Sequence, residues 1–168
     1  MSAPYPGADP AATYLTVREP DARFLDRPEA PASPTLVDSN IWLDILTQDP
    51  TWYEWSVGQL DALGQHADLI INPIIAAEIS PQYRTAAEFE HVLGLLPCKR
   101  EALPWDAAYF AGQAFKAYRT RMGEKRSPLP DFYVGAHATI RGYRLLTRDD
   151  ARYRTYFPRL EVISPDHR

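Results

Sequence analysis

Cysteine is almost absent from this chain of 168 residues: Cys98 is the only one, so no disulfide can form within the chain. A zinc site built from several cysteines is excluded for the same reason. The four histidines show no short spacing typical of metal ligands (His66, His91, His137 and His167). A single cysteine is consistent with a reducing compartment, so we expect a cytoplasmic protein.

Long apolar runs are also missing, because none approaches the ~18 residues that a membrane-spanning helix needs. The first residues lack the basic-then-apolar order of a signal peptide. The sequence contains no P-loop and no Asp-x-Asp-x-Thr motif after its first apolar segment. We therefore expect neither a membrane protein nor a secreted one, and the missing motifs count against NTPases and phosphatases.

Charge and proline are distributed unevenly. Residues 1–98 carry 4 basic and 14 acidic residues, whereas residues 99–168 carry 14 basic and 8 acidic ones. The basic part can meet phosphates locally, although charge alone favours solvated helix faces. Residues 1–34 hold seven of the 16 prolines and few large apolar side chains. We predict a flexible arm over 1–34, a compact domain over 35–164 and a tail over 165–168.

Within the predicted domain, short apolar segments alternate with segments of helical periodicity. Strands are predicted at 35–37, 69–71, 101–103, 144–147 and 160–163. Helices are predicted at 39–46, 52–64, 72–79, 85–96, 107–122 and 131–141, with a basic loop at 119–127. This alternation predicts an α/β fold whose parallel sheet is covered on both faces.

Four acidic residues follow strands or lie in helices: Asp38 and Asp149 come just after predicted strands, Asp131 lies in the first turn of a helix, and Glu78 lies one or two turns into another. Ligands of parallel sheets bind beyond the carboxyl ends of the strands, where Asp38 and Asp149 are expected. Each acid alone can be a helix cap or a partner of a helix dipole. Four converging carboxylates repel one another and favour a bound hard cation such as Mg²⁺ or Mn²⁺.

These segments resemble, in order, four motifs of PIN-domain nucleases, particularly the toxin ribonucleases of VapBC-type toxin–antitoxin pairs. The matching segments are 35–43, 72–78, 129–138 and 145–149, the last followed by 153–158. The resemblance covers roughly residues 35 to 164, and each motif is weak alone. It implies a three-layer α/β/α fold with a central parallel sheet, and endoribonuclease activity that depends on Mg²⁺ or Mn²⁺.

The resemblance also implies roles for single residues. Asp38, Glu78 and Asp131 would be the main metal ligands, directly or through water, and Asp149 would complete or support the site. Asn40 and Thr147 match polar positions near the family's site. For these two, simple capping and strand-end hydrogen bonding is an equally good interpretation.

Basic and aromatic residues near the motifs are candidates for contact with RNA. The basic candidates are Arg119, Arg121, Lys125, Arg126 and Arg148, together with Arg152. Tyr133 and Trp52 are undecided between stacking on bases and packing, and helical spacing places Trp42 in the core. We interpret Asp44 as a carboxylate on a helix surface. Solvated surface charge remains an alternative for each basic residue.

The resemblance implies a VapB-like antitoxin as partner and a homodimer of the free protein. A cleft rich in carboxylates also attracts a guanidinium group. We therefore expect an antitoxin segment across residues 42–46 and 52–63 that places an Arg or Lys near Asp38, Glu78 and Asp131. The alternative function is a catalytically silent PIN-like module that binds RNA or protein.

Overall fold

The computed structural model describes residues 32–122 and 129–165. The predictions for the arm up to residue 31, for Lys125 and Arg126 and for residues 166–168 lie outside the described residues. The described strands are β1 (Thr35–Val37), β2 (Leu69–Ile71), β3 (Lys99–Arg100), β4 (Arg144–Leu146) and β5 (Val162–Ile163). The helices are α1 (Ser39–Leu46), α2 (Tyr53–Gly64), α3 (Pro73–Ile79), α4 (Ala86–Leu95), α5 (Asp106–Met122), α6 (Leu129–Arg141) and α7 (Asp150–Tyr156), with a 3₁₀ turn η2 (Ser80–Gln82).

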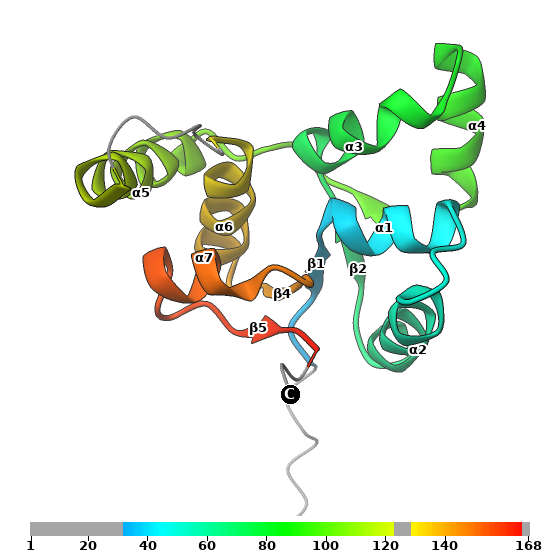
Figure 1. Ribbon diagram of the computed structural model, residues 1–168, viewed down its shortest axis with the longest axis horizontal. Coiled ribbons are helices and arrows are strands. Elements are labelled where there is room, and N and C mark those ends of the chain that lie inside the picture. Colours follow the sequence, from blue (N-terminus) through cyan, green and yellow to red (C-terminus); the bar gives the residue numbers. More distant parts are fainter. Residues whose placement is uncertain (1–31, 123–128, 166–168) are drawn as a thin grey trace, which may run out of the picture. The chain divides into compact units, whose positions relative to one another are not determined.

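The five strands form one sheet in the order β3-β2-β1-β4-β5, and every neighbouring pair is parallel. Helices α1 to α4 lie on one side of β1 in Figure 1, and α5 to α7 lie on the other. All residues of β1 and β2 are buried, as expected for strands that are covered on both faces. The predicted α/β fold with a central parallel sheet is confirmed.

Three helices begin where local capping signals occur in the sequence. The Asp38 side chain caps α1 by accepting a hydrogen bond from Ser39 N at 2.8 Å. Asn72 caps α3 by accepting from Ile75 N at 3.0 Å, and a proline follows it in the first turn. Thr85 caps α4 through Glu88 N at 3.1 Å. Two of these caps lie directly after strands, so they fix how α1 and α3 leave the sheet.

The core joins both sets of helices to the sheet. Trp42 is only 1% exposed and donates its indole N–H to Val37 O at 3.2 Å, which confirms its predicted core position. Phe132 on α6 lies at the centre of an aromatic cluster that joins α5, α6 and α7. Its ring neighbours are Phe115, Tyr118, Tyr156 and Phe157. None of the described helices is both long and apolar enough to cross a membrane.

Several predicted boundaries differ from the structure. The third strand is β3, not 101–103, because β3 is an exposed edge strand that needs no apolar residues. Its Lys99 and Arg100 pair with Asp68 at 2.6 Å and Glu90 at 2.5 Å. The last strand is shorter than predicted. Helix α6 starts at Leu129, since a proline is tolerated in a first turn.

Candidate active site

The carboxylate of Asp38 lies at the carboxyl end of β1 and is only 5% exposed. Its Oδ1 accepts from Ser39 N, and its Oδ2 accepts from Thr147 Oγ1 at 2.7 Å, Asn40 Nδ2 at 3.1 Å and Tyr153 O–H at 3.3 Å. Burial raises the pKa of Asp38, whereas the donors from Thr147, Ser39 and Tyr153 oppose the rise. The side chain is therefore fixed in place by neighbours from three different elements of the fold.

Asn40 and Thr147 connect the end of β4 to the start of α1. Asn40 Nδ2 donates to Thr147 Oγ1 at 3.0 Å, and Asn40 Oδ1 accepts from Arg148 N at 3.2 Å. Thr147 Oγ1 also accepts from Asp149 N at 3.1 Å. These two residues therefore hold both the Asp38 carboxylate and the backbone that carries Asp149. Their role goes beyond the capping of a helix or a strand end.

Glu78 belongs to the same negatively charged region. Burial raises its pKa, a hydrogen bond with the Ser39 side chain lowers it, and the charge of Asp38 raises it further. The charge of Asp149 likewise raises the pKa of Asp38. Asp38 thus lies within electrostatic reach of two of the other three predicted acids. Such mutual repulsion favours a cation among them.

Asp131 and Asp149 are joined by Arg152. Arg152 Nη1 contacts Asp131 Oδ2 on α6 and lies 3.9 Å from Asp149 Oδ2. Asp149 is exposed, whereas Asp131 is partly buried. Over residues 32–122 and 129–165, no three Asp, Glu, His or Cys side chains are arranged closely enough to hold a metal ion. The four acids therefore form two linked groups, and their role as ligands stays a prediction.

The chain resembles known proteins in sequence and in fold. The family model described as PIN domain matches residues 35–158, which is most of the chain. The chain belongs to the PIN domain family. No curated protein sequence matches this PIN domain.

Several solved structures resemble this PIN domain. VapBC2 from Rickettsia felis, bound to a DNA fragment from its promoter, has a TM-score of 0.61 at 15% identity and covers 79% of this chain and 99% of its own. FitAcB from Neisseria gonorrhoeae has a TM-score of 0.58 at 20% identity, with coverages of 80% and 99%. DNA-bound VapBC from Salmonella typhimurium has a TM-score of 0.58 at 18% identity, with coverages of 79% and 98%. At these identities the likeness establishes a shared fold.

Sequence reasoning assigned no role to Tyr153, although it contacts Asp38 in this PIN domain. The residue is 2% exposed, and burial together with the charges of Asp38 and Glu78 raises its pKa well above the ordinary value. The phenol therefore stays protonated and remains a hydrogen-bond donor to Asp38. A signal was present in the sequence: Tyr153 follows Asp149 by four residues, which is one helical turn.

The interpretation of Asp44 as a surface carboxylate is wrong. Asp44 is 2% exposed, accepts from Ser56 Oγ at 2.7 Å and pairs with Arg148 Nη2 at 2.9 Å. Burial raises its pKa, and Ser56 and Arg148 oppose the rise. The Arg148 guanidinium also lies over the Trp52 ring, 5.2 Å from its centroid. Arg148, predicted as an RNA contact, thus joins α1, α2 and the loop after β4.

Arg119 and Arg121, the other described RNA candidates, lie on the last turns of α5 and not in the predicted loop. Both are exposed, and their guanidinium groups lie 5.9 Å from the Phe115 ring and 6.0 Å from the Tyr156 ring. Tyr133 is partly buried. The helical position leaves both arginines open to solvent, so an RNA contact stays a prediction for them.

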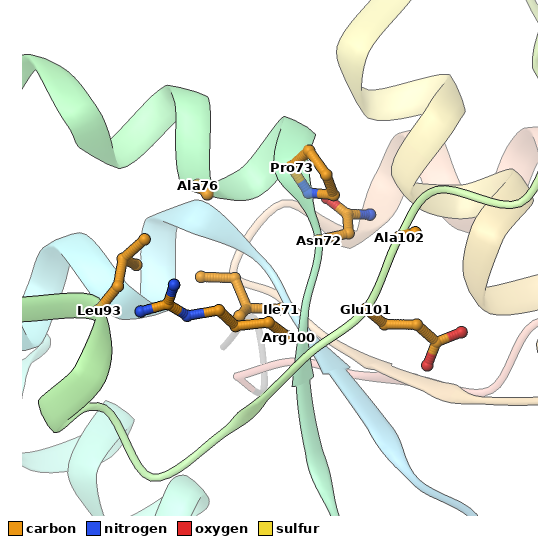
Figure 2. Close-up of a pocket in the computed structure, with 8 residues that line it drawn as sticks. All are labelled: Ile71, Asn72, Pro73, Ala76, Leu93, Arg100, Glu101 and Ala102. Carbon is orange, nitrogen blue, oxygen red and sulfur yellow. The ribbon is translucent and has the colours of Figure 1, made fainter. Parts of the chain in front are cut away.

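A cavity of about 240 Å³ opens at the carboxyl ends of β2 and β3. Figure 2 shows that the side chains of Arg100 and Glu101 point in opposite directions along its lining. Leu93 on α4 also lines it and is buried, whereas Phe89 and Val92 on α4 and Leu96 after it are partly buried. The apolar side of α4 therefore packs against the core only in part.

His137 lies fully buried behind this cavity. Its Nδ1 is 3.1 Å from Asn72 Nδ2, an amide donor, because the amide oxygen of Asn72 already accepts from Ile75 N. The imidazole therefore carries its proton on Nε2, 3.3 Å from Glu101 Oε1. Burial lowers the pKa of His137, and Glu101 opposes the shift. We interpret His137 as a neutral, structural histidine.

Proposed function

We propose that this PIN domain is an endoribonuclease that depends on Mg²⁺ or Mn²⁺ and acts as the toxin of a toxin–antitoxin pair. The observation that carries the proposal is the buried Asp38 carboxylate, with the charges of Glu78 and Asp149 within electrostatic reach. An ionised carboxylate is costly to bury unless partners or a cation compensate it. PIN-family membership and the position at the carboxyl ends of β1 and β4 support the same conclusion.

The chemistry of the donors fits a hard divalent cation. All four predicted ligands are carboxylates. Helix α6, which carries Asp131, also carries His137, and this histidine is neutral. Asp38, Glu78 and Asp131 would hold the ion, directly or through water, with Asp149 in support. When bound, the ion would lower the pKa of water and neutralise charge on a phosphoryl group.

The chain's own residues would then orient the reaction. Thr147, Asn40 and Tyr153 direct three donors at one oxygen of Asp38, which fixes the carboxylate in place. The bonds from Thr147 and Tyr153 oppose the rise in the pKa of Asp38 that burial causes. Attack by water, and not by the 2′-hydroxyl of the RNA, would leave a 5′-phosphate and a 3′-hydroxyl. Arg119, Arg121 and the two arginines of the β4–α7 region, Arg148 and Arg152, supply positive charge for the RNA backbone.

The similar solved structures are VapBC and FitAB complexes, and this supports a VapB-like antitoxin as partner. We also propose a homodimer of the free protein. Trp42 is too deeply buried to touch a partner, so an antitoxin segment on α1 would meet the partly buried Leu43, Ile45 and Leu46. An Arg or Lys of that segment would be attracted to Asp38 and Glu78.

The alternative is a catalytically silent PIN-like module that binds RNA or protein. One observation favours it: the described part of the chain holds no three metal-binding side chains already in ligand geometry. Cleavage by the purified protein therefore distinguishes the two functions.

The test incubates purified full-length protein with total cellular RNA in Mg²⁺, in Mn²⁺ and in EDTA, and maps the cleaved ends. We expect metal-dependent cleavage that Asp38→Asn and Asp131→Asn abolish with unchanged circular dichroism. Asp61→Asn, at an exposed position of α2, is the matched control and keeps full activity. Full activity in both site variants contradicts the proposed site, and an inactive wild-type protein favours the silent module.

A further inference from the structure

Arg152 lies between two acidic residues that come from different elements of the fold. Its guanidinium contacts Asp131 in the first turn of α6 and lies 3.9 Å from Asp149, which precedes α7. Its side chain is 29% exposed, so the group is sheltered but within reach of solvent. Arg152 thus supplies a positive charge between two carboxylates that we propose as ligands or supports of an ion.

The next residue on α7 reaches the other half of the acidic region. Tyr153 donates to Asp38 Oδ2 at 3.3 Å, whereas Arg152 turns toward Asp131. Helix α7 (orange-red in Figure 1) therefore contributes two consecutive side chains to the two groups of acids. The position of the guanidinium is fixed by the same short helix that helps to fix Asp38.

Arg154, on the same helix, shows the contacts of a structural arginine. It pairs with Asp150 at 2.6 Å and donates to Val162 O at 3.4 Å and Ser164 Oγ at 3.3 Å, so it ties α7 to β5. Arg152 differs because both of its ion-pair partners, Asp131 and Asp149, belong to the proposed active site. This difference indicates a role in the chemistry of the site.

We propose that Arg152 is a built-in counter-cation of the acidic site, which a divalent ion displaces from Asp131 and which then binds an RNA phosphate. The inference rests on the proposed function. A guanidinium and a divalent ion at the same oxygen of Asp131 repel each other, so they compete for it. Once released, the planar fork of the guanidinium fits a phosphate as well as it fits a carboxylate.

This role has a signature that a purely structural arginine lacks. Removing the guanidinium removes a competitor of the ion, so the affinity for Mn²⁺ rises, by roughly two- to tenfold for a partly exposed pair. The same change removes a phosphate contact, so RNA affinity falls. The slope of log affinity against log salt also becomes shallower by about 0.7 for single-stranded RNA. A structural role would move both affinities in the same direction or neither.

The experiment compares the wild-type protein with Arg152→Gln and the matched control Arg154→Gln. Mn²⁺ affinity is measured by isothermal titration calorimetry. RNA affinity is measured in Mg²⁺ at low temperature by fluorescence anisotropy of a labelled 20-nucleotide RNA, with its integrity checked on a gel. We expect Arg152→Gln to bind Mn²⁺ more tightly and RNA more weakly, and Arg154→Gln to match the wild-type protein in both.

Unchanged or weaker Mn²⁺ binding by folded Arg152→Gln overturns the inference and leaves the proposed function standing. If the wild-type protein binds no Mn²⁺, or if Asp38→Asn binds it as tightly as the wild type, the proposed function is overturned, and the inference with it. If Arg152→Gln does not fold, Arg152→Lys decides. That variant keeps the charge but loses the fork, so we expect near wild-type Mn²⁺ affinity and weaker RNA binding, and unchanged RNA binding overturns the phosphate contact.

Discussion

The ion pair between Asp44 and Arg148 gives the sharpest test of the structure. Arg148→Ala leaves a carboxylate that is 2% exposed with Ser56 as the donor that remains. Removing one partner of a fully buried pair costs about 3–5 kcal/mol. The Arg148 side chain is 29% exposed, so water can partly replace it, and we expect a loss of about 2–3 kcal/mol in the free energy of unfolding at pH 8.

The loss depends on pH with a sign that the structure determines. The pKa of Asp44 in the folded protein is above its ordinary value because of burial, and removal of Arg148 raises it further. The folded state of Arg148→Ala then takes up a proton more readily than the unfolded state. The loss of stability in Arg148→Ala is therefore complete at a pH above the raised pKa of Asp44 in the folded variant, and it shrinks as the pH falls toward the pKa of Asp44 in the unfolded chain.

Urea denaturation followed by far-ultraviolet circular dichroism at pH 8 and pH 5 measures this dependence. The double variant Asp44→Asn/Arg148→Ala carries no buried charge at this position, so we expect it to recover at least half of the stability lost at pH 8. Equal losses at both pH values with no recovery in the double variant would refute the reasoning and leave packing on Trp52 as the contribution of Arg148. A stable double variant also allows the RNA contact of Arg148 to be tested separately from folding.

Two further predictions concern packing and polar contacts elsewhere. A Cβ at Gly135 would lie 2.4 Å from Phe157 Cε2. Gly135→Ala should therefore lower the melting temperature, because overpacking costs about 1–3 kcal/mol and the gain in helix propensity is about 1 kcal/mol. Gly112→Ala on α5, where a Cβ would meet nothing within 4 Å, should raise the melting temperature. Equal shifts in the two variants would contradict the close contact. Although burial raises the pKa of Glu101, hydrogen bonds from Tyr143 and His137 and the charge of Arg141 lower it overall. The ionised Glu101 therefore stabilises the folded protein at a pH above the ordinary pKa of a glutamate, and this stabilisation is lost as the pH falls through the lowered pKa. Glu101→Gln should therefore destabilise the protein by roughly 1–2 kcal/mol at pH 7 and by less near pH 3 in urea denaturation, and an equal loss at both pH values would argue against an ionic role.

Features that depend on neighbouring residues in the sequence were predictable. The caps at Asp38 and Asn72 are local, so the starts of α1 and α3 followed from the sequence. Strand ends share one edge of a parallel sheet, and this predicted that Asp38 and Asp149 lie on the same edge, where the charge of Asp149 raises the pKa of Asp38. The alternation of strands and helices was enough for the fold class.

Features that depend on packing between distant segments were not predictable in the same way. Asp44 is buried because Ser56 on α2 and Arg148 after β4 cover it. The periodicity of α1 cannot indicate either residue, because both lie elsewhere in the chain. The edge position of β3 follows from sheet order, so a charged pair of residues forms the strand in place of the apolar segment after it. The contact between Arg152 and Asp131 also requires α6 and α7 to meet.

The hydrogen bond between Thr147 and Asp38 also bears on the synthesis of the protein. It spans 109 residues of sequence, and Tyr153 reaches Asp38 from still farther along the chain. When only α1 to α5 have left the ribosome, Thr147 and Tyr153 are not yet available to donate hydrogen bonds to Asp38. If this PIN domain cleaves RNA as proposed, its nascent chain stays harmless to the messenger and the ribosome that produce it until β4 and α7 have emerged.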